Sequence, residues 1–417
     1  MTTRKLKILI YGSGNGREHA TYVAIQKDID CECYCAIKNA NALFEEMPNV
    51  YRINDVNGAI ALAKELVIDR VLILSPLELI SGDSDKFRWA GFNTFGASER
   101  SSRLESSKSF AKEFMQCYNI PTPECRVFTD YSAAEQTLKN EWSDRNFVIK
   151  PDIFSMNAYD RTATPESLED AVLHLQRFHT MNSDSPVILE HRISGYELSL
   201  HVLFTGNDYF ILPLVQDHKR LYDQDMGPMT HGMAALAFNG NYPSKLLKNI
   251  KSKIIEPTLL GLNQEGIEFN SILYFGLMIS EETPYLLEYN VRSGNPEWIS
   301  ILGLLDSSLI DALDSPKSKN WKQGYSLTSF LTTKEYPIVN KENFSMSISN
   351  IHPVNSCKVF GESIIKRAGH YYPSGGRVLA FRDTGSDFEL IKKNVLSAIG
   401  GVKYEGKQYR TDMLPFF

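Results

Sequence analysis

The sequence predicts a protein of mixed α/β and α+β class. Through residue 96, strand-like apolar runs alternate with helix-like stretches, a pattern that is typical of parallel sheets. After Pro121-Thr-Pro123 the strand-like runs follow one another across short turns, which favours antiparallel pairing. The polar stretch Asp314–Gly324 is an expected linker, and residues 325–417 beyond it are expected to form a β-rich C-terminal domain with a last helix near Phe388–Ala398.

The N-terminal region, residues 1–102, begins with an expected strand at Lys7–Tyr11 and a glycine-rich turn, Gly12-Ser-Gly-Asn-Gly16, that leads into a helix. Backbone amides at such a turn can bind phosphate, and Arg17 beside it suits an anion. The glycines can equally serve only the tight turn. The other expected elements are strands at Cys31–Ile37, Asp69–Leu74 and Phe92–Gly96, and helices at Asn57–Leu66 and Asp83–Ala90.

The central region, residues 103–320, starts with an expected helix at Lys108–Tyr118, which the following prolines end. Another helix is expected from Thr164, because threonine caps, proline takes the first turn and acidic residues follow. The remaining expected elements are strands at Phe147–Lys150, Val187–Arg192, Tyr196–Phe204, Tyr209–Val215, Asn270–Ile279 and Tyr285–Asn290, and a long helix at Ser244–Leu262.

Composition restricts the classes of partner. The chain has 417 residues, with 44 lysines and arginines against 50 acidic residues and a net charge of −6. This balance argues against nucleic acid or an anionic membrane as the main partner. We find no apolar run long enough to span a bilayer and no signal-peptide pattern. We therefore expect a cytoplasmic protein that acts on small molecules, as a monomer or a homodimer.

The six cysteines fit a reducing compartment. Cys31, Cys33 and Cys35 alternate along one expected strand, so their side chains share a face. A metal or redox cluster is one interpretation, but zinc-binding pairs use wider spacing and no partner pair of His or Cys follows. The favoured interpretation is a buried strand face lined with small apolar side chains.

Two lysines and one strand end are the candidate chemical groups of the central region. Lys108 starts a helix and Lys150 ends a short apolar strand, which suits nucleotide phosphates, although two surface lysines would look the same. Glu288 and Asn290 share a face at another strand end, and their hard oxygens suit Mg²⁺ bridged to phosphates. Arg292 could then clamp a carboxylate or phosphate. An ordinary strand end with an ion pair explains these three residues equally well.

A dense polar segment, Asp217–Gly227, follows an apolar strand. A solvated loop is the usual explanation of such a run of charge. Loops of this kind also gather substrate contacts, so the segment is a candidate substrate loop.

Taken in chain order, these features resemble the phosphoribosylamine–glycine ligase (glycinamide ribonucleotide synthetase) family of ATP-grasp enzymes. The resemblance runs along nearly the whole chain and rests on several ordered motifs. They are Gly14-Asn-Gly-Arg-Glu-His-Ala20, Phe95-Gly96, Leu104-Glu-Ser-Ser-Lys108, Asn119-Ile-Pro-Thr122, Gln216-Asp-His-Lys-Arg220 with Gly227-Pro228, Leu287-Glu-Tyr-Asn-Val-Arg292 with Gly294, Pro296 and Glu297, Ser374-Gly-Gly-Arg-Val378, and Gln408-Tyr-Arg-Thr-Asp412.

The resemblance implies an ATP-grasp fold with a Rossmann-like N-terminal domain that binds substrate, a lid at roughly 122–190, and a C-terminal domain. It also implies a ligase of purine biosynthesis. ATP would phosphorylate the carboxylate of glycine, and 5-phosphoribosylamine would then displace phosphate to give glycinamide ribonucleotide. The implied cofactors are ATP and Mg²⁺, with Mn²⁺ as a substitute.

The family's functional residues are carried over to matching positions of this chain. Those implied for the nucleotide are Lys108 and Lys150 at the phosphates, Glu190 at the adenine hinge and Glu197 near the ribose or the metal, with Glu288 and Asn290 as metal ligands. Those implied for catalysis are Arg292, Asp217 and Lys219. Those implied for substrate binding are Gly14, Gly16, Arg17, Glu18, Asp225, Gly227, Pro228, Gly294, Pro296 and Glu297.

The chain departs from the family pattern at the lid and in the substrate segments. The stretch Lys150–Asp160 has no glycine and no second lysine, so backbone amides cannot approach phosphate as closely. The side chains left as donors there are Ser155, Asn157 and Arg161. The departures in the substrate segments are Met229, His231 and Asn295. Two alternatives therefore stay open: a divergent ligase for another amino acid or amine, and an ATP-grasp binding protein without turnover.

Overall fold

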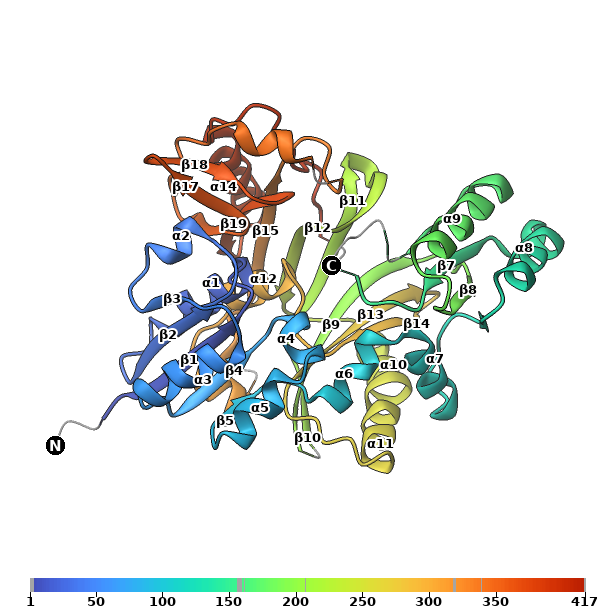
Figure 1. The fold of residues 1–417 in the computed structure, drawn as a ribbon, viewed down its shortest axis with the longest axis horizontal. Coiled ribbons are helices and arrows are strands. Elements are labelled where there is room, and N and C mark those ends of the chain that lie inside the picture. The colour runs from blue at the N-terminus through green and yellow to red at the C-terminus, as the bar shows by residue number, and fades with distance from the viewer. Residues whose placement is uncertain are drawn as a thin grey trace.

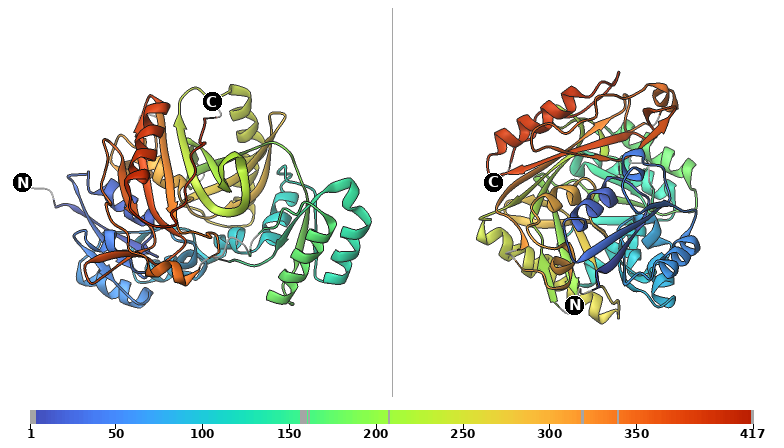
Figure 2. Two further views of the ribbon diagram at one scale, coloured as in Figure 1. Left: turned by 90° about the horizontal axis from the view of Figure 1, so that it is seen from above. Right: turned by 90° about the vertical axis from the view of Figure 1, so that its left-hand side faces the viewer.

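The structure is a computed structural model that describes residues 4–155, 160, 162–206, 208–317, 320–338 and 340–415. In these residues a parallel sheet, a small antiparallel sheet with two helices, and a long antiparallel sheet form three adjoining parts (Figure 1). Seen from above, the small sheet and its helices stand out from the rest of the molecule (Figure 2, left).

The N-terminal region forms the predicted parallel sheet, in the order β3-β2-β1-β4-β5. Its strands are β1 (Leu6–Gly12), β2 (Cys31–Ile37), β3 (Val50–Arg52), β4 (Arg70–Ile73) and β5 (Asn93–Phe95). Ile8 and Ile10 of β1 enter one core, whereas Leu9 and Tyr11 enter another. Side chains alternate along a strand, so this partition shows a sheet covered on both faces, and the predicted α/β class is confirmed.

Local capping fixes the turn after β1. Asn15 accepts the amide of Arg17, and Glu18 accepts the amide of Asn15 at 2.9 Å, which is the reciprocal pattern of a capping box. The helices of this region and the next are α1 (Gly16–Ile25), α2 (Ala42–Glu45), α3 (Val56–Glu65), α4 (Pro76–Ile80), α5 (Asp83–Trp89), α6 (Glu99–Ser106) and α7 (Lys108–Cys117).

The small sheet has the antiparallel order β6-β8-β7 and a core of its own. Its elements are β6 (Cys125–Phe128), α8 (Tyr131–Arg145), β7 (Phe147–Pro151), α9 (Leu168–Met181) and β8 (Val187–His191). These elements fall in the range predicted for the lid. The cap of α9 is Ser167, which accepts the amide of Asp170 at 3.1 Å. The prediction that this helix starts at Thr164 was therefore wrong, because a second capping residue lies three positions on.

The long sheet has nine strands, in the order β14-β13-β9-β11-β12-β15-β19-β16, with β10 beside β9. They are β9 (Tyr196–Thr205), β10 (Asp208–Ile211), β11 (Leu214–Tyr222), β12 (Met226–Asn239), β13 (Ile272–Ser280), β14 (Thr283–Asn290), β15 (Gly324–Thr332), β16 (Lys358–Gly361) and β19 (Arg377–Gly385). β12 pairs directly with β15, so the sheet continues across the boundary predicted near residue 320.

The helices of this part include one that the sequence predicted as a single element. Ser244–Leu262 forms α10 (Ser244–Ile250) and α11 (Glu256–Gln264), joined by a π-helical turn at Lys251–Ile255. The others are α12 (Glu297–Gly303), α13 (Leu309–Asp314) and α14 (Phe388–Gly401). α14 packs on β19 and β15, and a hairpin of β17 (Ile364–Arg367) and β18 (His370–Pro373) lies beside this part.

Two predictions, one for a strand and one for the polar segment after it, were wrong. Tyr209–Val215 is not one strand but spans the gap between β10 and β11. The segment Asp217–Gly227, expected to be a loop, is the second half of β11, a short turn and the start of β12. Charged side chains in a strand hide its apolar alternation, and the register shifts in this pair add to the irregularity.

No helix in the described ranges is long and apolar enough to cross a membrane. The described cysteines are unpaired, and Cys33 and Cys35 lie in the core beside β1.

Candidate functional site

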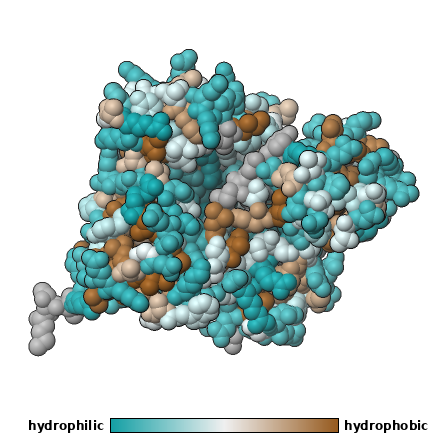
Figure 3. All heavy atoms as spheres, in the orientation of Figure 1, coloured by the Kyte–Doolittle hydropathy of each residue, from teal (hydrophilic) through white to brown (hydrophobic). Residues whose placement is uncertain are grey.

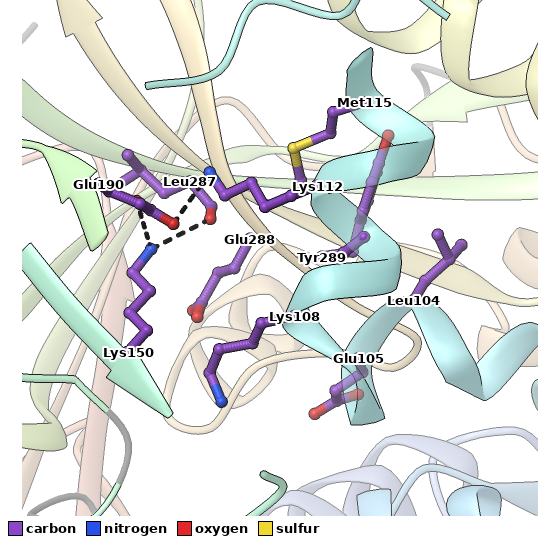
Figure 4. Close-up of a pocket in the computed structure, with 11 residues that line it drawn as sticks. Leu104, Glu105, Lys108, Lys112, Met115, Lys150, Glu190, Leu287, Glu288 and Tyr289 are labelled. Carbon is purple, nitrogen blue, oxygen red and sulfur yellow. Dashed lines mark hydrogen bonds and ion pairs between the residues drawn. The ribbon is translucent and has the colours of Figure 1, made fainter. Parts of the chain in front are cut away.

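A pocket lies where the small sheet meets the long sheet. Its volume is about 380 Å³, part of which is open to solvent, and Figure 3 shows a hollow in the middle of this face of the molecule. α6 and α7 form one side, β7 and β8 a second, and β14 a third (Figure 4). The lining residues are Leu104, Glu105, Lys108, Ala111, Lys112, Met115, Lys150, Glu190, Leu287, Glu288 and Tyr289.

Three buried charged side chains from three elements meet in this pocket. Lys150 of β7 donates to Oε2 of Glu190 in β8 at 2.8 Å, and Nζ of Lys112 on α7 lies 3.0 Å from the other carboxylate oxygen. Lys150 also donates to the carbonyl of Leu287 at 3.4 Å. The structure thus brings together two residues that the sequence predicted for the nucleotide, Lys150 and Glu190, and adds Lys112, which sequence analysis missed.

Burial and charge oppose each other in this group. Burial raises the pKa of Glu190, but the positive charges of Lys112 and Lys150 outweigh it and leave the pKa below its ordinary value. Burial lowers the pKa of Lys112, and the attraction of Glu190 offsets only part of that effect. Glu190 is therefore ionised between two lysines, and the group favours an additional negative charge.

Lys108 lies one helical turn before Lys112 and anchors the chain that follows β7. Its ammonium donates to the carbonyls of Pro151 at 3.0 Å and Ile153 at 2.7 Å, and its amide donates to Asp152. Lys108 and Lys150 both line the pocket, as a shared nucleotide site requires. Of the side chains predicted as donors in the glycine-free stretch, Asn157 and Arg161 lie outside the described residues.

Glu288 and Asn290 lie at the end of β14, and Glu288 lines this pocket. Asn290 is buried and accepts from Arg292 at 2.9 Å. In the part of the chain that the structure describes, no group of three or more His, Cys, Asp or Glu side chains could hold a metal ion. One carboxylate and one amide oxygen still fit Mg²⁺, because this ion commonly takes few protein ligands and completes its shell with phosphates and water.

Arg292 is held in a defined position just beyond β14. It forms an ion pair with Glu105 of α6 at 2.9 Å, and Glu105 also accepts the amide of Val291 at 2.9 Å. Its Nε has no hydrogen-bond partner among the described residues, and the same holds for Nε of buried Arg17 and Nδ1 of His201. Burial, followed by repulsion from Arg292, lowers the pKa of Arg17 to about 10. Unused donors near one another suit an anionic substrate group.

Asp217 and Lys219 of β11 form a second charged cluster with residues of neighbouring elements. Lys219 forms an ion pair with Glu197 of β9 at 2.9 Å and lies 4.0 Å from Asp217. Oδ1 of Asp217 has no hydrogen-bond partner among the described side chains and backbone groups. Burial, then the negative charge of Glu297 on α12, raises the pKa of Asp217 well above its ordinary value, and Lys219 only partly offsets this.

This shift predicts a pH dependence of stability. The folded state holds the Asp217 proton more tightly than the unfolded state, so from the ordinary carboxyl pKa of about 4 upward the wild type loses stability relative to Asp217→Asn. We expect the free energy of unfolding of the wild type, minus that of the variant, to fall as pH rises, until the folded-state pKa is passed. Urea unfolding of both proteins across this pH range measures it, and a difference that does not vary with pH would contradict the shift.

The glycine-rich turn is closed by a carboxylate from the C-terminal part of the chain. The amide of Gly16 donates to Oε2 of Glu362 at 2.7 Å, and Glu362 also accepts from Asn295 and from Arg377, each at 2.9 Å. Gly14 has a φ of +85°, which favours glycine. The amide predicted to bind substrate phosphate is thus paired with a carboxylate in this structure.

The other predicted substrate residues divide between two places. Gly294 donates its amide to His201 at 3.0 Å and precedes Pro296, the N-cap of α12, and Glu297, its first residue. Asp225 lies at the far turn between β11 and β12, where it forms an ion pair with buried Arg410 at 2.6 Å. Gly227 and Pro228 are in the first residues of β12 beside it. The role of each as a substrate contact stays a prediction.

Glu18 is also buried but faces its own region. Its carboxylate accepts from Ser75 at 2.6 Å and from the amide of Asn15, and burial raises its pKa. These contacts hold the turn in shape. Of the missed residues, Lys112, His201 and Glu362 carry no motif, and Glu105 lies in the motif Leu104-Glu-Ser-Ser-Lys108 but received no role. Lys112 follows Lys108 at helical spacing, and this could have indicated a shared face.

The contacts of Lys150 lead to a prediction for Lys150→Met. A charged hydrogen bond to phosphate is worth about 1.5–3 kcal/mol, so the variant should bind ATP at least about tenfold more weakly. The fold should persist, because Lys112 still pairs with Glu190. Calorimetric titration with ATP measures the affinity, and circular dichroism checks the fold. Equal affinity in variant and wild type would remove Lys150 from the nucleotide site.

Comparison with known proteins shows the family of the chain. Residues 6–105 match the N domain of phosphoribosylglycinamide synthetase, and residues 106–298 match the ATP-grasp (A) domain of the same enzyme. A phosphoribosylamine–glycine ligase of Clostridium acetobutylicum is 31% identical, with 98% of this chain and 99% of the relative covered. One of Caldanaerobacter subterraneus is 30% identical at the same coverage.

Solved structures extend the similarity to the fold. The phosphoribosylamine–glycine ligase of Thermotoga maritima superposes with a TM-score of 0.81 at 26% identity, over 98% of this chain and all of that one. A biotin carboxylase of Campylobacter jejuni reaches 0.71 at 13% identity, over 96% of this chain and 92% of that one, which shows a shared fold alone. The predicted ATP-grasp fold is confirmed, and the chain belongs to the phosphoribosylglycinamide synthetase family of carbon–nitrogen ligases.

Proposed function

We propose that this protein is an ATP-dependent ligase that joins glycine to 5-phosphoribosylamine and yields glycinamide ribonucleotide in purine biosynthesis. The observation that carries the proposal is the pocket in which Lys108, Lys112 and Lys150 lie with Glu288. Relatives that are named for this activity match the chain over nearly their whole length. The pocket supplies cations for phosphates and a carboxylate for a metal ion at one place.

The proposed chemistry has two steps. A carboxylate oxygen of glycine attacks the γ-phosphorus of ATP, and ADP leaves to give an acyl phosphate. The nitrogen of the amine then attacks the acyl carbon, phosphate leaves, and the nitrogen loses a proton. Both steps develop negative charge on phosphate oxygens, so fixed positive charge stabilises their transition states.

Most of the predicted residues have a role in this scheme. Lys108 and Lys150 bind the ATP phosphates, Glu190 lies at the adenine, and Glu197 lies near the ribose or the metal. Arg292, with its position fixed by Glu105, orients the acid. Asp217 and Lys219 face the amine, and the unpartnered oxygen of Asp217 is a candidate acceptor for the proton that the nitrogen loses. The glycine-rich turn with Arg17 and Glu18, the β12 start and the Gly294–Glu297 segment surround the substrates.

The proposed metal ion is Mg²⁺, for which Mn²⁺ can substitute, held by Glu288 and Asn290. Mg²⁺ would supply charge neutralisation at the phosphates. We further propose that the enzyme acts in the cytoplasm on small molecules, as a monomer or homodimer, and without nucleic acid or membrane partners.

A growth test addresses the acid and amine directly. Expression of the chain in a strain that lacks its purine-pathway ligase should restore growth without added purine, and Glu288→Gln should not. Purified protein with ATP, Mg²⁺, glycine and phosphoribosylamine should release phosphate only when all are present. Phosphate release with other acids but no growth would support a divergent ligase, and no release with any acid would support a binding protein.

One observation favours the divergent ligase as a second candidate. Glu362 places a carboxylate on the Gly16 amide, where the sequence predicted a phosphate, and like charges repel at close range. Arg377 and Asn295 hold that carboxylate in place. A panel of amines with and without a phosphate group, in the same phosphate-release assay, separates the two candidates.

A further inference from the structure

Lys112 is the one buried lysine of the described pocket to which the sequence assigned no role. It lies on α7 four residues after Lys108, so both side chains share a helix face. Its ammonium lies 3.0 Å from Glu190 and donates to Thr122 at 2.6 Å, and only 3% of the residue is exposed. Thr122 in turn donates to the carbonyl of Leu286 in β14 at 2.7 Å. Lys112 is therefore fixed between α7, β8 and the segment beside β14.

The charges of the group show what Lys112 contributes. Glu190 is 1% exposed and is shared by two ammonium groups, one on each carboxylate oxygen. With Lys150 alone, the carboxylate would cancel the lysine charge, and the pair would offer a phosphate no net attraction. With Lys112 present, two cations and one anion leave one net positive charge. Figure 4 shows the two amines on either side of the carboxylate.

The hydrogen-bond capacity of Lys150 agrees with this count. An ammonium group has three donors, and those of Lys150 meet Glu190 and the carbonyl of Leu287. No described residue takes the third donor, which is left for a ligand. Because Lys112 also pairs with the carboxylate of Glu190, this carboxylate does not fully neutralise the charge of Lys150. Lys150 can therefore keep its contact with Glu190 and still attract an anion.

We propose that Lys112 is a positioning residue of the nucleotide site, which shares Glu190 with Lys150 and thereby keeps one net positive charge available to the ATP phosphates. This inference rests on the proposed use of ATP and adds a third lysine, one that acts through Glu190. A purely structural ion pair would stabilise the fold without distinguishing nucleotides that differ in phosphate content.

The test compares ATP with adenosine, both titrated by calorimetry with excess Mg²⁺. Lys112→Met removes the net charge and should lower the ratio of ATP to adenosine affinity by about tenfold. Lys112→Met with Glu190→Gln restores a net charge of one, and the ratio should return to within about threefold of wild type. Lys139→Met is the matched control, because Lys139 is an exposed lysine of α8 paired with Glu135.

Each outcome decides the proposal. An unchanged ratio in Lys112→Met, or a double variant as weak as the single one, overturns it. If Lys112→Met does not fold, Glu190→Gln and the double variant differ by the same charge, and Glu190→Gln should show the higher ratio. A wild type that binds no ATP overturns the proposed function and this inference together, whereas a wild type that binds ATP with an unchanged ratio in Lys112→Met overturns the inference alone.

Discussion

Glu288→Gln is expected to reduce turnover by about a thousandfold or more, because the proposed metal ion would lose its charged protein ligand and the transferring phosphoryl group would lose several kcal/mol of stabilisation. ATP binding without turnover should fall much less, since Lys108 and Lys150 remain in the pocket. Phosphate release under saturating ATP and acid gives the rate, and calorimetry gives the affinity.

The fold should survive this substitution. Gln matches Glu in shape, and the close approach of the Glu288 side chain to Gly276 of β13 depends on shape rather than charge. Glu282→Gln is the control, because Glu282 precedes the same strand and its ion pair with Lys245 is exposed. A wild-type rate in Glu288→Gln, or a nucleotide complex with Mg²⁺ out of reach of both Glu288 and Asn290, would contradict the metal assignment.

The parallel sheet could be predicted from sequence because its signals are local. β1 contains the apolar run Ile8–Tyr11, and the Asn15 and Glu18 caps start α1 within a few residues of it. The β11 strand could not be predicted in the same way. Its residues Gln216–Arg220 include the charged side chain of Lys219, which pairs with Glu197 on β9, and such a partner, rather than local propensity, helps to make a polar strand stable.

The residues of the candidate site likewise divide into those with a local sequence signal and those without one. Lys108, Lys150 and the Glu288–Arg292 segment stand at element ends, and the structure brings Lys108, Lys150 and Glu288 to one pocket. The Glu190 carboxylate joins residues of two elements far apart in the chain, and Glu362 meets Gly16 from 346 positions away. Such contacts depend on how whole parts of the molecule pack, which single-sequence patterns do not contain.

Arg292→Lys is the second substitution with a large expected effect, a loss of about a hundredfold in turnover on the acid with little change in ATP affinity. The guanidinium contacts Glu105, Asn290 and the carbonyl of Ser293 from its two terminal nitrogens, at 2.9, 2.9 and 3.2 Å. A lysine keeps the charge but has one nitrogen, so it cannot hold these contacts and still offer a donor to a carboxylate.

The loss should appear mainly in the dependence on the acid. Arg292 orients the carboxylate in this proposal, so both the KM for the acid and kcat should worsen, whereas the KM for ATP should stay near wild type. Arg103→Lys on α6 is the matched control, because Arg103 is exposed and stacks over Phe110 at 4.1 Å, away from Glu105. If Arg292→Lys weakened ATP and the acid equally, Arg292 would belong to the phosphate-binding group, and the clamp on the acid would have to come from Arg17, whose buried Nε lacks a partner among the described residues.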